Sequence, residues 1–195
     1  MLVGAPERFR SSNGNDLVDE FGTLFKQHKA EHAFGLILNH RHFDMNPDER
    51  LVEYRGTSVP WTRLLDKAKP SSWLFAEDGN CLPYEFHYSP DAAGDESESP
   101  NDPKYNEFIR SFNSLLHQKD AVGLFGPCVY PGDDFEGRVE IRANTNLHPD
   151  DAPKALVSTP AAWFFVQILQ ESAFTSVEET AIPGLPTKAT LAVDK

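Results

Sequence analysis

Apolar positions with helical spacing form two stripes along the chain. The first stripe consists of Leu17, Phe21, Leu24, Phe25 and His28. The second consists of Tyr105, Phe108, Ile109, Phe112, Leu115 and Leu116. A cap-rich stretch at 11–15 precedes the first stripe, and Asp102 followed by Pro103 precedes the second. These patterns predict two amphipathic helices whose apolar faces lie on a sheet as part of the core.

Extended apolar runs follow each helix. In the first half the pattern predicts a helix over 15–31 and strands over 33–43, 50–61, 71–77 and 82–89. In the second half it predicts a helix over 103–119 and strands over 121–130, 137–147, 161–169 and 173–179. Breaker clusters at 46–49, 78–80 and 131–134 mark turns. The predicted fold class is α+β, with helices packed on a curved, mostly antiparallel sheet.

The two halves also match each other in order. At an offset of 88, Leu17, Phe21 and Leu24 fall on Tyr105, Ile109 and Phe112, and 33–36 falls on 121–124. With one residue dropped, 52–55 falls on 139–142, and at an offset of 90, 70–75 falls on 160–165. These matches predict two tandem α-β-β-β-β modules. The alternative is two unrelated halves that share a generic helix-then-strand pattern.

This interpretation divides one compact domain, 1–195, into segments. Pseudo-repeat 1 covers about 15–89, an acidic loop covers 90–102, and pseudo-repeat 2 covers about 103–180. The remaining 181–195 is expected to be an irregular tail. A cleft is expected where the two modules meet.

Composition narrows the possible partners. The chain has 195 residues, of which 39% are hydrophobic, and its net charge is -12. This charge disfavours binding to nucleic acid and to anionic membranes, because such binding depends on Lys and Arg. The sequence shows neither a signal-peptide apolar region nor an apolar run of membrane-spanning length, so we expect a cytoplasmic protein.

The most distinctive local feature is a strand end with two histidines. His40 and His42 alternate and continue the face of Phe34, Leu36 and Leu38. Such imidazoles are candidates for general acid–base catalysis, with Asp44 or Glu85 orienting the ring.

A second alternating pair, Glu85 and His87, lies on a later predicted strand. Together with His40 and His42 it has the ligand types of a divalent metal site. However, the neighbouring Tyr84, Phe86 and Tyr88 make the better core face, and the second half does not repeat these ligands. Hydrogen-bonded structural histidines without a cofactor are therefore the preferred interpretation, with a divalent metal as the alternative.

Other catalytic signatures are missing from the sequence. It contains no Gly-rich phosphate loop, no Gly-x-Ser-x-Gly and no His-Glu-x-x-His motif. Cys81 and Cys128 are too far apart for a metal knuckle, and neither lies in a nucleophile context.

The stretch from 39–44, Asn-His-Arg-His-Phe-Asp, through 50–53, Arg-Leu-Val-Glu, resembles a motif in small uncharacterised proteins of filamentous fungi. The resemblance covers about fifteen residues. It implies a fungal, intracellular origin, and it transfers no activity or site.

Two functions are consistent with these patterns. The first is a domain that binds a small molecule or a protein in the cleft between the modules. The second is a small metabolic enzyme that uses His40 and His42 as metal ligands or as general acid and base. The ligand-pocket residues expected for either function are Asp44, Glu85 and His87.

Overall fold

A computed structural model describes residues 5–11, 13–40, 44–63, 67–90, 98–141, 145–151, 159–166 and 187–191. Its helices are α1 (Ala5–Ser11), α2 (Gly14–Gln27) and α3 (Asn106–Gln118), with short 3-10 turns η1 (Pro103–Tyr105) and η2 (Pro149–Asp151). The first five strands are β1 (Phe34–Leu38), β2 (Arg50–Tyr54), β3 (Thr57–Trp61), β4 (Ala68–Phe75) and β5 (Cys81–Tyr88). The others are β6 (Phe125–Val129), β7 (Val139–Ile141), β8 (Thr145–Leu147), β9 (Thr159–Phe164) and β10 (Thr187–Leu191).

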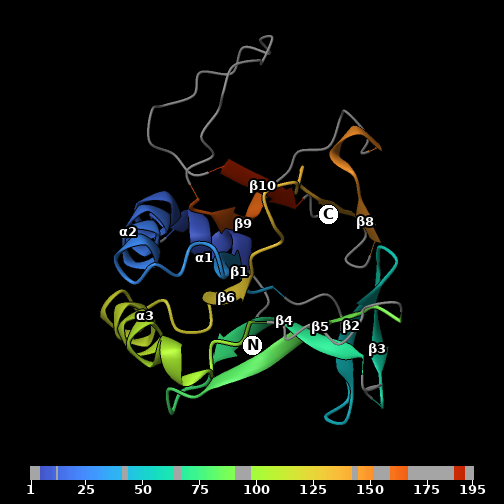
Figure 1. The fold of residues 1–195 in the computed structure, drawn as a ribbon, viewed down its shortest axis with the longest axis horizontal. Helices are drawn as coiled ribbons and strands as arrows, with labels where there is room; N and C mark the ends of the chain where they lie inside the picture. Colours follow the sequence, from blue (N-terminus) through green and yellow to red (C-terminus); the bar gives the residue numbers. More distant parts are fainter. Residues whose placement is uncertain are drawn as a thin grey trace.

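The strands form one sheet in the order β10-β9-β1-β6-β4-β5-β2-β3-β8-β7. Only the β2–β5 pair is parallel among the described strands. The sheet is strongly curled (Figure 1). Its end strands, β10 and β7, are in contact. The predicted α+β class, with helices on a curved and mostly antiparallel sheet, is confirmed. Within the described ranges, no helix is long and apolar enough to cross a membrane.

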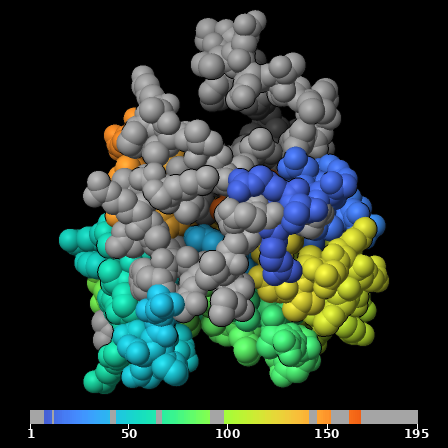
Figure 2. Space-filling view, turned by 180° about the vertical axis from the view of Figure 1, so that it is seen from behind, coloured from blue at the N-terminus to red at the C-terminus, as the bar shows by residue number. Residues whose placement is uncertain are grey.

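The helices cover one face of the sheet, which we call the outer face. Figure 2 shows α2 (blue) and α3 (yellow) lying next to each other along one side of the molecule. Both predicted stripes point into the core: Phe21 and Phe112 are fully buried, with ring centroids 4.6 Å apart. Such aromatic packing supplies much of the apolar area that stabilises the fold.

Each of these two helices ends in the same way. Lys29 and Asp120 adopt left-handed φ values of 55° and 51°. The next residues, Ala30 and Ala121, donate backbone hydrogen bonds to carbonyls five residues earlier, at 2.9 and 2.8 Å. This is the Schellman arrangement, which satisfies the last helical carbonyls. It turns the chain directly into β1 and β6, respectively.

The structure differs from the predicted elements at several places. The predicted strand 50–61 is the hairpin β2–β3, because Arg55 and Gly56 both have positive φ (50° and 77°) and close a two-residue turn. Likewise, 137–147 contains two strands, β7 and β8. Residues 187–191, expected in an irregular tail, form β10 against β9. The predicted strand at 173–179 lies outside the described residues.

Candidate functional site

The face of the sheet opposite the helices, which we call the inner face, is apolar on one side. Ile37, Cys128, Ala162 and Phe164 form a buried cluster there, with Tyr130 packed against it. The pairing of β1 with β6 and with β9 brings these residues together. They are separate from the larger core beneath the helices.

The same face becomes polar towards β5 and β7. Ser72 pairs with both Cys128 and Glu85, so these three side chains share a face. Glu85 pairs with Leu51 of β2, and the next β2 residue on that face is Glu53. The buried polar or charged residues of the described chain are Asn39, Ser58, Ser72 and Glu140.

His40 links two strands that are not neighbours in the sheet. Its Nε2 lies 3.1 Å from Oε2 of Glu140 in β7, and Tyr84 of β5 donates a 2.7 Å hydrogen bond to the His40 carbonyl. Its Nδ1 lies 3.0 Å from the carbonyl oxygen of Leu38. Both members of the His40–Glu140 pair are largely buried, with side chains 12% and 3% exposed.

Glu140 was missed by the sequence interpretation. The sequence does contain a signal for it, because the match of 52–55 with 139–142 aligns Glu140 with Glu53. Glu140 is 2% exposed, and a buried carboxylate is costly unless it is paired. Its burial next to an imidazole therefore identifies it as a candidate functional group.

Of the other predicted site residues, Glu85 and His87 bond to different partners. Ser72 donates a 3.2 Å hydrogen bond to Glu85, whereas His87 bonds Glu53 at the edge of the face. Asp44 lies exposed on the surface, and His42 lies outside the described residues. In the part of the chain that is described, no three His, Cys, Asp or Glu side chains are grouped as a metal site would require.

The thiols of Cys81 and Cys128 have low nucleophilic reactivity. Burial raises the pKa of Cys81 to about 12. Burial, together with the nearby charge of Glu85, raises the pKa of Cys128 to about 12. Since the thiolate is the reactive form, neither cysteine is a nucleophile near neutral pH.

The Glu53–His87 pair makes stability depend on pH. Burial raises the pKa of Glu53, but hydrogen bonds from His87 and the Gly56 N–H, with the charge of Arg138, outweigh it and the pKa falls below 4.5. The ionised carboxylate therefore stabilises the fold above pH 4.5, and this contribution is lost as pH falls through the lowered folded-state pKa.

We expect Glu53→Gln to lose less stability than the wild type on acidification. Urea midpoints measured from pH 7 down to pH 3 should converge as the pH falls. Glu77→Gln, which changes an exposed carboxylate in the turn between β4 and β5, should behave like the wild type. Parallel curves for the wild type and Glu53→Gln would contradict the assignment.

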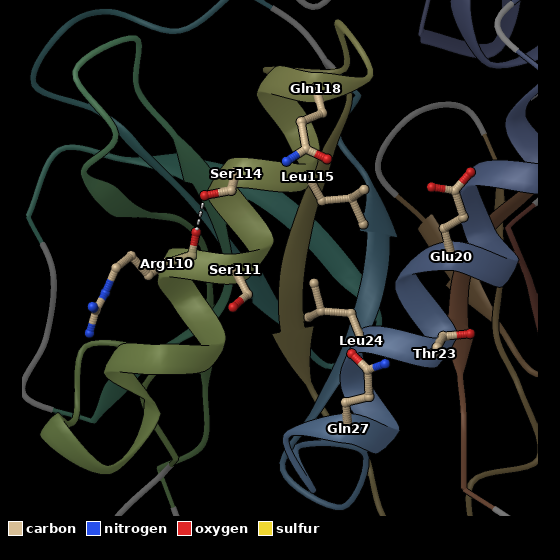
Figure 3. Close-up of a pocket in the computed structure, with 9 residues that line it drawn as sticks. All are labelled: Glu20, Thr23, Leu24, Gln27, Arg110, Ser111, Ser114, Leu115 and Gln118. Atoms are coloured by element: carbon tan, nitrogen blue, oxygen red, sulfur yellow. Dashed lines mark hydrogen bonds between the residues drawn. The ribbon is translucent and has the colours of Figure 1, made fainter.

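A second candidate site is a groove of about 520 Å³ between α2 and α3 (Figure 3). Leu24 and Leu115 approach each other from the two helices, whereas the side chain of Arg110 points away from α2. The lining residues are Glu20, Thr23, Leu24, Gln27, Arg110, Ser111, Ser114, Leu115 and Gln118.

The polar groups of this groove are mostly engaged locally. The Thr23 and Ser114 hydroxyls donate to backbone carbonyls of their own helices, at 3.1 and 2.8 Å. Glu20 forms an ion pair with Lys119 across the two helices, at 2.6 Å. The groove thus has few polar groups directed at a common point. A ligand site typically has several such groups.

Comparisons with known proteins identify no relative. No family model matches the chain. Neither the curated proteins nor the solved structures give a significant match. Of the two sites, the inner face is the better candidate because its polar groups are buried next to an apolar cluster.

Proposed function

We propose that the chain consists of two tandem modules related by an approximate two-fold axis, and that it binds a small molecule on the inner face that they share. The helix ends support the first part. The Schellman hydrogen bonds of Ala30 and Ala121 lie 91 residues apart, as do those of Lys29 and Asp120. These helix ends align at an offset of 91 and not at the 88 expected from the sequence. The offset of 91 aligns Phe21 with Phe112.

Strand pairing supports the same relation. β1 and β6 pair with each other symmetrically about Leu36 and Pro127, which are also 91 residues apart. Their outer neighbours correspond as well, because Ile37 pairs with Ala162 while Cys128 pairs with Ser72. Ser72 and Ala162 are 90 residues apart, the offset that the sequence indicates for this block.

The two tryptophans occupy corresponding surroundings. Trp73 packs edge-on against Phe34, with ring centroids 6.1 Å apart, and Trp163 packs against Phe125 at 6.0 Å. Both indoles are buried in the outer-face core. Equivalent positions in two copies of one module account for this agreement.

The observation that carries the binding function is the composition of the inner face. Strands from both halves contribute to it, and buried polar side chains lie beside the cluster of Ile37, Cys128, Ala162 and Phe164. Small-molecule sites combine an apolar surface with a few fixed polar groups in this way. The net charge of -12 supports a partner that is neither nucleic acid nor an anionic membrane. The resemblance carried by 39–44 and 50–53 supports a fungal, intracellular origin.

The function can be tested on natively purified protein. We expect heat denaturation to release a small molecule in stoichiometric amount, detectable by mass spectrometry. Glu85→Ala should lose this molecule, because it changes the polar side of the inner face. Ser114→Ala, in the helix groove, should retain it. Loss of the molecule in Ser114→Ala but not in Glu85→Ala would refute the proposed site, and so would wild-type protein that neither carries a small molecule nor binds one in titration.

A second candidate function is an acid–base enzyme centred on His40. The Leu38 carbonyl can only accept a hydrogen bond, so Nδ1 of His40 carries a proton. The contact between Nε2 and Oε2 of Glu140 then holds a further proton, because both atoms are otherwise acceptors. The two contacts fix the orientation of the ring, and the proton between Nε2 and Oε2 is the one that such an enzyme would exchange with its substrate. Turnover of a carbonyl compound that is abolished in His40→Gln would favour the enzyme.

A further inference from the structure

Asn39, directly after β1, carries a buried side-chain amide that has no role in the fold so far described. The residue is 1% exposed. Within the residues that the structure describes, neither its Oδ1 nor its Nδ2 has a hydrogen-bond partner. Its backbone N–H is engaged, donating to the Leu124 carbonyl at 2.8 Å. Native proteins rarely leave a buried polar group unpaired, so this amide requires an explanation.

The amide lies on the inner face. Asn39 follows Ile37 by two residues, and a Cβ atom built on Gly126 would lie 3.1 Å from the Asn39 Oδ1. Gly126 pairs with Ile37 in the β1–β6 ladder, so it shares the face of the apolar cluster. β1 and β6 run side by side in the middle of the sheet (Figure 1). The next residue, His40, is paired with Glu140. The amide therefore lies between the apolar cluster and the polar groups.

We propose that Asn39 binds the ligand through a planar group that presents a hydrogen-bond donor beside an acceptor, such as a carboxamide or the edge of a nucleobase. This inference rests on the proposed small-molecule function. An asparagine amide offers an acceptor and donors in one plane, so such an edge satisfies both atoms at once.

The surrounding charge disfavours anions. The inner face carries the carboxyl groups of Glu53, Glu85 and Glu140. An ionised carboxylate ligand would be repelled by them, and it has no donor for the Asn39 Oδ1. The apolar cluster provides a surface for the flat body of an aromatic ligand. The ligand class is thus an uncharged or cationic ring with a donor–acceptor edge.

The first test concerns the free protein. Asn39→Leu replaces the amide by an apolar group of similar shape. If the amide serves a ligand, the melting temperature of ligand-free Asn39→Leu should equal or exceed that of the wild type. Ser72→Ala, which removes a hydroxyl bonded to Glu85, should lower it. A clear drop for Asn39→Leu would mean that the amide has a structural partner or a bound water, and it would overturn the proposal.

The second test uses three defined probes. Nicotinamide and adenine carry donor–acceptor edges, whereas nicotinate has the same ring as nicotinamide with a carboxylate. By calorimetric titration we expect the wild type to bind nicotinamide or adenine but not nicotinate, and Asn39→Leu to lose at least about tenfold in affinity. Binding of nicotinamide alone would identify the group recognised by Asn39 as a carboxamide. Binding of adenine alone would identify it as the edge of a nucleobase.

Two results would overturn the inference, and they differ from failure of the function itself. Equal binding of nicotinamide and nicotinate would exclude edge recognition. Retention of the natively bound molecule by Asn39→Leu would refute the role of Asn39, although the proposed function would stand. If wild-type protein carries no small molecule and binds none of the three probes, both proposals fail together.

Discussion

Phe21→Ala and Phe112→Ala should each lower the free energy of unfolding by about 3–5 kcal/mol, the usual cost of emptying a fully buried phenylalanine site. Both rings are 0% exposed, and each comes from the apolar stripe of its helix. They also contact each other, with centroids 4.6 Å apart at 42°. Truncating either ring leaves a cavity at the junction of the two helices. Chemical denaturation with a fitted two-state transition measures the loss.

The tandem-module proposal makes this result more specific. Under that proposal Phe21 and Phe112 hold corresponding places in the two modules, so their losses should be similar. The double variant should show a coupling of about 0.5–1.5 kcal/mol, as expected for an aromatic pair. Thr23→Ala, on the exposed side of α2, serves as the control and should change little. A large loss at only one of the two phenylalanines would contradict the equivalence.

The parts of the fold that the sequence predicted are those with a strong local signal. The stripes through Phe21 and Phe112 predicted both long helices and the face that each buries, because a helical period needs no knowledge of distant contacts. The matched blocks around Trp73 and Trp163 indicated strands in the same surroundings. Fold class followed from these elements.

Register and turn geometry were harder to predict. At the helix ends, the left-handed residues are Lys29 and Asp120 and not glycine. The sequence therefore does not mark the residue at which each helix ends. The turn at Arg55–Gly56 also lacks the Asn-Gly or Asp-Gly signal of a two-residue hairpin. α1 was missed because its seven residues are too few to show a period.

The candidate site was predictable only in part. His40 was expected from its residue type and position, and the structure gives it a buried partner. Glu140 lies a hundred residues away, so its contact depends on how the sheet curls. Asn39 is chemically ordinary in the sequence, and only its burial without a partner in the described chain marks it. Such features depend on tertiary structure.

His40→Leu should lower the free energy of unfolding by about 3–5 kcal/mol, because it leaves the Glu140 carboxyl buried without its imidazole hydrogen bond. The double variant His40→Leu/Glu140→Leu should recover most of this loss, since well-packed apolar residues often replace a buried pair at little cost. Denaturant midpoints of the wild type, the two single variants and the double variant give the coupling directly.

A surface pair of the same chemistry provides the control. His148 bonds Glu136 at 2.8 Å, but both side chains are well exposed. His148→Leu should leave the midpoint nearly unchanged, because solvent screens such pairs. If His40→Leu lowers the free energy of unfolding no more than His148→Leu does, the His40–Glu140 pair is not shielded from solvent. If the double variant does not recover, another group holds Glu140. Recovered stability with lost binding or turnover would mean that the pair is maintained for its chemistry at a cost to the fold, as functional sites often are.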